Sequence, residues 1–327
     1  MQADDVQNTK RFRTQKSRSQ HKLTFRDRLS VFHQVNPFRR GHMRDQTGLD
    51  QAREHDAVES HPGMLRAKIS VAIKAFSMEM RRAIDRAMEL GAQGIQVDLR
   101  TDLLADHYGA SARRQLLHVL DERHLQLASG HFPLRNPITS KEHLGPRLTA
   151  LESAIVFASK LKIRTLTLRA GRIPDPEQNE EDYGSLHSII SDLAAQGNRH
   201  GVTLCLLPCG ESAVQLRQFI ESVKSGPVMV DADLGSWVMN RQSVVSQLRE
   251  LHDLIGHVEI RDAIRDVDGR GREVPVGEGE IDWDEVVALL NEMSYSGWLN
   301  LDRYEGTDRM GDISRGVSYL KKRLPMA

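Results

Sequence analysis

The chain has 327 residues, of which 39% are hydrophobic, 5% aromatic and 28% charged, and its formal net charge at pH 7 is zero. This composition is that of an ordinary globular protein, and the balanced charge gives no global indication of a nucleic-acid partner. No apolar run reaches the roughly 18 residues of a bilayer-spanning helix, and the first residues lack the apolar core of a secretion signal, so we expect a cytoplasmic protein.

The first 63 residues have almost no apolar periodicity. Basic side chains crowd their first part, namely Lys10, Arg11, Arg13, Lys16, Arg18, Lys22, Arg26, Arg28, Arg39, Arg40 and Arg44. Such a segment cannot bury enough apolar surface to fold alone, so we expect 1–63 to be a disordered basic extension or the product of a wrongly assigned start, with Met43 and Met64 as alternatives to Met1. A tail that binds nucleic acid or an acidic partner is less favoured, because no aromatic stacking pattern accompanies the charge.

After Met64 the chain alternates short β-rich runs with amphipathic stretches, which is typical of parallel strands joined by crossover helices. About eight strands are expected, the number that closes a (βα)8 barrel of about 250 residues. They are Lys68–Ile73, Gly94–Asp98, Leu125–Gly130, Thr165–Arg169, Thr203–Leu207, Val228–Asp231, His257–Arg261 and Trp298–Asp302.

Two of the stretches between these strands have clear helical stripes, Met78–Leu90 and Arg147–Leu161. Gly91 and Gly201 stand where a left-handed helix cap is expected. A doubly wound open sheet fits the same alternation, but it usually has a glycine-rich turn after its first strand, and the segment 73–77 has no glycine. The sequence therefore favours an α/β fold, a (βα)8 TIM barrel over residues 64–327.

Polar residues gather where the predicted strands end. In a (βα)8 barrel these C-terminal ends converge on one pocket, so the set indicates a site more strongly than any one residue does. Three or four carboxylates in one pocket raise at least one pKa or recruit a divalent metal unless arginines neutralise them. The set is Asp98, His131, Arg169, Asp231, Glu259, Arg261, Asp262, Asp302 and Arg303.

The segment from Val274 to Trp283 contains Gly-Glu-Gly-Glu-Ile-Asp-Trp and precedes a predicted helix and the last strand. Here the chain resembles the sugar-phosphate isomerase/epimerase family, the xylose isomerase-like TIM barrels. Further matches are His257–Asp262, Val230-Asp231, and Gly130-His131 with Pro133, so the resemblance covers nearly all of the chain after Met64. The glycine loop itself is expected to be a structural turn before the helix that begins near Asp282.

The resemblance implies a divalent metal, held by a glutamate, an aspartate, a histidine and a second glutamate on strands five to eight. Carried over by motif, the metal ligands are Asp231, Glu259 at the histidine position and Asp302 at the last glutamate position. Because these ligands offer only oxygen, we expect Mn²⁺ or Mg²⁺ rather than Zn²⁺.

Two departures from the family pattern weaken the expected metal binding and activity. The fifth-strand glutamate position is occupied by Leu207, and Leu234 replaces a histidine that often contacts the substrate. Glu211 or Cys209 could each supply a substitute ligand. With only two cysteines in the chain, Cys205 and Cys209, we expect reduced thiols and no disulfide framework.

The leading hypothesis is an isomerase or epimerase acting on a sugar, a sugar phosphate or a related polyol, and a homo-oligomer is compatible with it. Asp302 or Glu259 removes the proton next to the carbonyl, while His131, Arg169 and Arg261 bind the substrate, and a guanidinium at Arg169 favours an anionic one. A second hypothesis is a barrel that has lost catalysis and binds a sugar-like ligand or a protein partner. Metal-dependent phosphodiester hydrolysis is a third, and it requires histidine-rich metal sites that the sequence after Met64 does not show.

Overall fold

Each of the eight predicted strand segments forms a strand, and together they close into a barrel. In the computed structural model, which describes residues 67–266 and 271–324, the order round the barrel is β1-β10-β7-β6-β5-β4-β3-β2 with parallel pairing throughout. The predicted (βα)8 barrel is therefore confirmed. Its strands are β1 Lys68–Ala72, β2 Gly94–Asp98, β3 Gln126–His131, β4 Thr165–Leu168, β5 Thr203–Leu206, β6 Val228–Asp233, β7 Ile255–Ile260 and β10 Trp298–Leu301.

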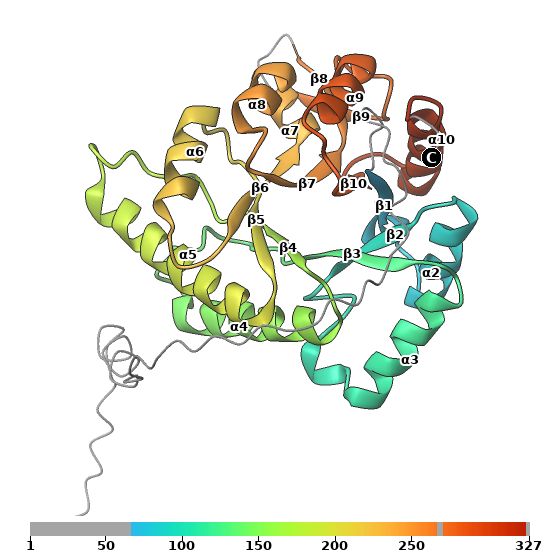
Figure 1. Ribbon diagram of the computed structural model, residues 1–327, viewed down its shortest axis with the longest axis horizontal. Coiled ribbons are helices and arrows are strands. Elements are labelled where there is room, and N and C mark those ends of the chain that lie inside the picture. Colours follow the sequence, from blue (N-terminus) through green and yellow to red (C-terminus); the bar gives the residue numbers. More distant parts are fainter. Residues whose placement is uncertain (1–66, 267–270, 325–327) are drawn as a thin grey trace, which may run out of the picture. The chain divides into compact units, whose positions relative to one another are not determined.

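Helices surround this ring of strands (Figure 1). The α-helices are α2 Met80–Glu89, α3 Ala110–Asp121, α4 Leu144–Lys160, α5 Glu180–His200, α6 Ala213–Ser222, α7 Leu234–Met239, α8 Val244–Leu251, α9 Trp283–Glu292 and α10 Arg309–Lys321, and two short 3₁₀ helices are η1 Ile73–Phe76 and η2 Ala105–His107. None of the described helices is both long enough and apolar enough to cross a bilayer. The described residues all belong to one compact unit, Glu59–Ala327, and the predicted extension over 1–63 lies outside them.

Local chemistry explains where several helices begin and end. Helix α6 starts with a capping box between Ser212 and Gln215, and α5 ends at Gly201, whose φ of 67° confirms the predicted left-handed cap. Helix α4 begins three residues before the predicted Arg147, because Pro146 falls in its first turn, where a proline is tolerated. Asp282 caps α9 by accepting hydrogen bonds from the backbone N–H groups of residues 284 and 285.

A hairpin that the sequence pattern did not predict lies between β7 and α9. It pairs β8 Asp262–Ile264 with β9 Arg272–Val274 in antiparallel register. The two strands have only three residues each, too few to show a clear period, and this is why the segment escaped prediction. The hairpin matters because it brings Glu273 to the arginines that follow β7 and β10.

Apolar side chains fill the layer between the strands and the helices, whereas the inside of the barrel is polar. Along β10, for example, Leu299 and Leu301 belong to the hydrophobic core, while Asn300 between them is fully buried and hydrogen-bonded to Glu259 of β7. Alternation along a strand produces this division. Polar side chains buried on the barrel strands include Ser70, Gln96, Ser129, Thr167, Asp231, His257, Glu259 and Asn300.

Candidate functional site

The predicted site residues all stand at the C-terminal ends of barrel strands. Asp98 and His131 end β2 and β3, Arg169 follows β4, Asp231 lies in β6, Glu259 lies in β7 and Asp302 follows β10. In this fold that end of the barrel carries the chemistry. The residues nevertheless divide between a pocket at the mouth of the barrel and a fully buried cluster.

The pocket at the mouth has a volume of about 270 Å³ and brings His131 and Asp302 together with Lys74. Its other lining residues include Gln96, Asp98, Arg303, Tyr304 and Arg309. Asp98 forms an ion pair with Lys74 and accepts backbone hydrogen bonds from residues 100 and 101, so it also orders the loop after β2. The volume lies just below the usual range for small-molecule sites, which suits a compact ligand.

His131 is a neutral imidazole at pH 7. Burial is the main cause that lowers its pKa to about 4, despite the nearby carboxylates of Asp231 and Asp98, which act in the opposite direction. Its Nδ1 lies 2.9 Å from Oγ1 of Thr167, which fixes the ring. A neutral ring of this kind can donate a hydrogen bond to a substrate hydroxyl or accept one from it.

Asp302 is a buried carboxyl group at the same pocket. Burial raises its pKa to about 6, against the opposing influence of Arg261, and its Oδ1 accepts a 2.7 Å hydrogen bond from the backbone N–H of Arg303. A carboxylate with a pKa near the working pH is both available and basic enough to accept a proton.

Glu259 lies deeper in the barrel and is 1% exposed. Its Oε1 accepts from Nε2 of Gln96 and its Oε2 from Nδ2 of Asn300, both at 2.8 Å, while Asn300 accepts in turn from the Ser70 hydroxyl at 3.0 Å. Burial, followed by the charges of Asp231 and Asp302, raises the pKa of Glu259 well above its usual value. These contacts place the side chains of Glu259 and Asn300 inside the barrel.

A buried pair that the family pattern did not single out stands beside Glu259. Nδ1 of His257 lies 2.8 Å from Oδ1 of Asp231, and both residues are fully buried. Asp231 Oδ2 and His257 Nε2 have no hydrogen-bond partner among the described residues. Asp231, His257 and Glu259 each offer a ligand atom, and these atoms all lie within 4.8 Å of one another.

These three residues fit a divalent metal. Buried polar atoms almost always have a partner, so the orphaned Oδ2 of Asp231 indicates a missing one. Nδ1 of His257 faces both carboxylates, 2.8 Å from Oδ1 of Asp231 and 3.7 Å from Oε1 of Glu259, so in its unprotonated form it offers a lone pair to an ion held between them. Among the described residues this is the one such group, and it contains Asp231 and Glu259 but not Asp302. An imidazole changes the expected oxygen-only ligand set to one that transition metals also accept.

Side-chain alternation along β7 relates His257 to Glu259. The two residues are separated by one position of the same strand, so their side chains point to the same side. Motif matching assigned a single ligand to this strand, and it assigned Glu259. The sequence alone could not show the register of β6 against β7, in which His257 pairs with Asp231 and not with a neighbouring residue.

Arg261 and Arg169, both expected to bind substrate, lie in different environments. Arg261 is 4% exposed and donates to Asp233 at 2.6 Å and to Glu273 at 2.8 Å, with its guanidinium 4.0 Å from the centre of the Tyr304 ring. It is therefore fully engaged within the protein. Arg169 donates to the carbonyl of Pro208 at 2.9 Å and lies 3.6 Å from Asp233, but 41% of its side chain is exposed, so it keeps a face for a ligand.

The two positions that depart from the family pattern are occupied by buried apolar side chains. Leu207 is 4% exposed and Leu234, in the first turn of α7, is fully buried. Neither candidate replacement joins the buried cluster, since Glu211 accepts hydrogen bonds from the backbone of Ile173 at 2.8 Å and of Cys209 at 2.5 Å. Glu211 thereby fastens a loop rather than reaching the metal ligands.

The glycine-rich motif is structural. Oδ2 of Asp262 accepts from the backbone N–H of Gly277 at 2.9 Å and of Gly279 at 3.2 Å, and from Nε1 of Trp283 at 2.9 Å. A Cβ atom on Gly279 would lie 1.9 Å from Oδ1 of Asp262, so only glycine fits. The loop therefore wraps a buried carboxylate, as expected of a turn that positions α9.

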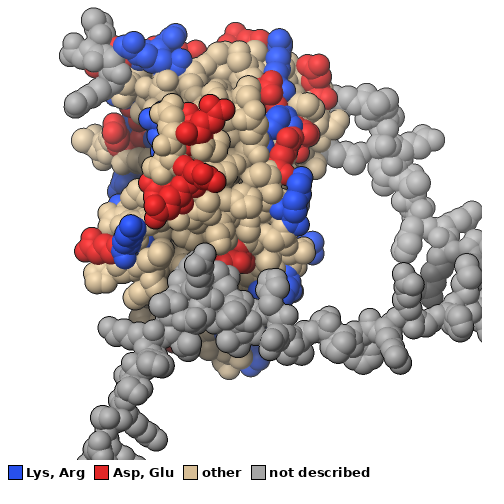
Figure 2. Space-filling view, turned by 90° about the vertical axis from the view of Figure 1, so that its left-hand side faces the viewer, with Lys and Arg blue, Asp and Glu red and all other residues tan. Residues whose placement is uncertain are grey.

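Among the described residues one candidate metal group is found, that of Asp231, His257 and Glu259. Basic and acidic side chains mix on the uncovered part of the face shown in Figure 2, where no continuous basic surface is visible. DNA-binding enzymes need such a surface to hold the phosphate backbone.

Residues 84–323 match the protein family described as "Xylose isomerase-like TIM barrel". No protein of curated function matches the chain. Among solved structures, a xylose isomerase domain protein from Planctomyces limnophilus has a TM-score of 0.70 and 19% identity, covering 80% of this chain and 98% of its own. A xylose isomerase-like TIM barrel protein from Mycobacterium smegmatis in complex with magnesium has a TM-score of 0.63 and 16% identity, covering 79% and 96%.

Sugar epimerases have the same fold. D-psicose 3-epimerase from Clostridium cellulolyticum H10, solved with D-tagatose, has a TM-score of 0.62 and 14% identity, covering 78% of this chain and 98% of its own. At these identities the likeness concerns the fold.

Proposed function

Because the chain belongs to the xylose isomerase-like TIM barrel family, we propose that it isomerises or epimerises a small polyhydroxylated carbonyl compound by moving a proton next to the carbonyl. The observation that carries this proposal is the pairing of Asp302 and His131 in one pocket at the barrel mouth. Asp302, with a pKa of about 6, is poised to accept a proton at neutral pH, and His131 is held neutral beside it.

In this scheme Asp302 removes the proton from the carbon next to the carbonyl and returns it to the former carbonyl carbon, which gives the isomer, whereas an epimer requires that a proton be returned from the opposite face. His131 orients the substrate by hydrogen bonding one of its hydroxyls, with its ring fixed by Thr167. Lys74 and Arg309 stand at the same pocket and offer positive charge to an anionic substituent or to a developing enediolate. Fixed charges and donors at the reacting atoms lower the barrier without reorganising during the reaction.

A metal site beside the pocket strengthens the same proposal. Asp231, His257 and Glu259 would hold a divalent ion, for which Mn²⁺ and Mg²⁺ are the leading candidates. Such an ion supplies positive charge that stabilises an enediolate. A related barrel protein was solved in complex with magnesium, which supports the choice. With His257 in the ligand set, Asp302 is left free for proton transfer.

Incubation of the protein with Mn²⁺ and a panel of sugars and sugar phosphates in D₂O tests the proposal. Deuterium should appear at a carbon next to the carbonyl, as detected by NMR, because the proton that Asp302 returns exchanges with solvent. Replacing Asp302 with Asn should slow the exchange by about 10²- to 10⁴-fold, the usual contribution of a general base. Absence of exchange with every substrate in the panel would count against catalysis.

The second candidate function is ligand binding without catalysis, and Leu207 and Leu234 favour it. Both are buried apolar side chains at positions where the family uses polar groups. If the same panel contains a sugar that binds, by calorimetry, but exchanges no deuterium, the depleted-barrel hypothesis is the better one.

A further inference from the structure

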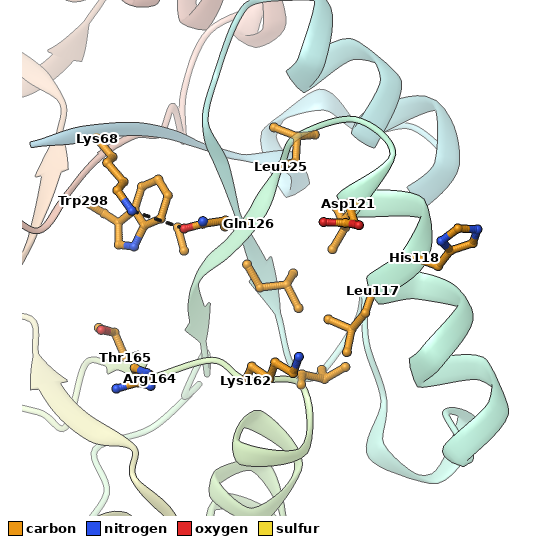
Figure 3. A pocket seen from close by; sticks show the side chains of 14 residues that line it. Lys68, Leu117, His118, Asp121, Leu125, Gln126, Lys162, Arg164, Thr165 and Trp298 are labelled. Atoms are coloured by element: carbon orange, nitrogen blue, oxygen red, sulfur yellow. Dashed lines mark hydrogen bonds between the residues drawn. The ribbon is translucent and has the colours of Figure 1, made fainter. Parts of the chain in front are cut away.

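A second pocket, of about 710 Å³, lies at the opposite end of the barrel from the candidate site. It is lined by the first residues of β1, β3, β4 and β10, namely Lys68, Gln126, Thr165 and Trp298, together with residues of α3 and of the turn between α4 and β4. Figure 3 shows Lys68, Gln126 and Trp298 on one side of this pocket, with Leu117 and Lys162 across from them. Its volume lies well within the range of small-molecule binding sites.

The pocket joins an apolar lining to cationic side chains. Leucines 117, 120, 125, 127 and 161 contribute the apolar surface, and Lys68, Lys162 and Arg164 contribute the charge, against the single carboxylate of Asp121. The side chains of Lys162 and Arg164 make no ion pair or hydrogen bond with any described residue. Both are exposed, so two cations are free to hold an anion at this pocket.

Trp298 adds a flat aromatic surface. It is partly exposed, and Lys68 sits over its ring with Nζ 5.2 Å from the centroid, while Lys68 also contacts Oε1 of Gln126 at 3.4 Å. An indole edge and leucine side chains accept an aromatic ring, and a guanidinium binds phosphate oxygens through its paired N–H groups.

We propose that this pocket binds a small aromatic phosphate, with its ring against the leucines and Trp298 and its phosphate on Lys162 and Arg164. The site is distinct from the candidate active site, because strand β3 runs from Gln126 at this pocket to His131 at the mouth. At about 3.3 Å a residue, a strand of this length separates the two sites by roughly 16 Å.

The three tryptophans of the chain make the proposal testable by ¹⁹F NMR on protein labelled with 5-fluorotryptophan. Trp298 lines the pocket, whereas Trp237 and Trp283 are 1% and 2% exposed and lie elsewhere. Addition of 1-naphthyl phosphate should shift one of three resonances, the one that Trp298→Phe removes. Neither 1-naphthol nor inorganic phosphate at the same concentration should shift it to the same extent, because each carries only half of the proposed recognition.

The variant Lys162→Gln/Arg164→Gln should weaken naphthyl phosphate binding at least about tenfold, which corresponds to about 1.4 kcal/mol. Lys160→Gln is the matched control: Lys160 is exposed at the end of α4, carries the same charge and does not line the pocket. It should leave the affinity unchanged. The proposal is overturned if the Trp298 resonance does not respond to naphthyl phosphate, if naphthol binds equally well, or if the double variant and the Lys160 control behave alike.

Discussion

Asp231 and His257 face each other across β6 and β7, with 2.8 Å between Oδ1 and Nδ1, and each keeps one fully buried polar atom without a partner among the described residues. Such an arrangement costs free energy in a protein with nothing bound there, since an unsatisfied buried group loses its hydration without compensation, about 1–3 kcal/mol each. A cation among Asp231, His257 and Glu259 would give Oδ2 of Asp231 a partner and recover that part of the cost.

The metal ligands can be identified by titrating Mn²⁺ into the protein and its variants in a calorimeter. His257→Asn should lower the Mn²⁺ affinity at least about tenfold, whereas Asp302→Asn should change it little, because Asp302 is not within the ligand group. Motif matching to the family makes the opposite prediction for Asp302. Circular dichroism confirms that each variant is folded, and an Asp302→Asn protein that no longer binds Mn²⁺ would refute the ligand set with His257.

The amino-acid sequence alone is enough to predict the barrel strands but not the complete set of candidate metal ligands. Short β-rich runs alternating with amphipathic stretches were enough to predict all eight barrel strands, within one or two residues at each end, because this pattern is a local property of the chain. The positions of Asp302 and His131 at strand ends followed from the same pattern. Their meeting in one pocket required only the general geometry of the barrel.

What the sequence could not give depends on contacts across the fold. The register between β6 and β7 shifts between Val230 and Asp231, and this irregularity places Asp231 directly opposite His257. Arg261 was expected to bind substrate, but its guanidinium donates hydrogen bonds to Asp233 and Glu273. Glu273 lies in a hairpin strand of three residues, which is too short to predict from the sequence. Side-chain partners of this kind are determined by tertiary packing.

Replacing Asp302 with Asn should stabilise the protein at neutral pH. The pKa of Asp302 is about 6 in the folded protein and near 3.8 in the unfolded chain, so the folded state favours the protonated carboxyl. The stability that this preference contributes is fully present below pH 3.8 and is lost as the pH rises through about 6. At pH 7 the buried charge therefore costs about 3 kcal/mol, which the amide avoids. Urea unfolding at pH 7 should show this gain together with the loss of deuterium exchange. An unchanged or lower midpoint would contradict the burial of an ionised Asp302.

His131 should give the opposite dependence on pH. Its folded-state pKa, lowered to about 4 from 6.5, means that the unfolded chain takes up the proton first, so stability is lost as the pH falls from about 6.5 towards 4. Because His131 is only half-buried, we expect a loss of about 1–2 kcal/mol in the free energy of unfolding over this range. His131→Asn should flatten the curve of unfolding free energy against pH between these values. If the variant and the parent protein keep the same slope, His131 is not held neutral by burial.

The loop that wraps Asp262 should tolerate no side chain at Gly279. A Cβ there would lie 1.9 Å from Oδ1 of Asp262, so Gly279→Ala must displace the loop and weaken the hydrogen bonds that Asp262 accepts from Gly277, Gly279 and Trp283. Hydrogen bonds to a charged group contribute about 1.5–3 kcal/mol, and we expect a loss of stability of about that size.

Gly184→Ala is the matched control, since nothing lies within 4 Å of a Cβ at that position in α5, and alanine should stabilise the helix by about 0.5–1 kcal/mol. Because the loop contributes no residue to the pocket at the mouth, Gly279→Ala should retain deuterium exchange wherever it stays folded. An unfolding free energy equal to that of the parent protein would show that the motif is not needed for stability, and its role would then have to be sought in the reaction.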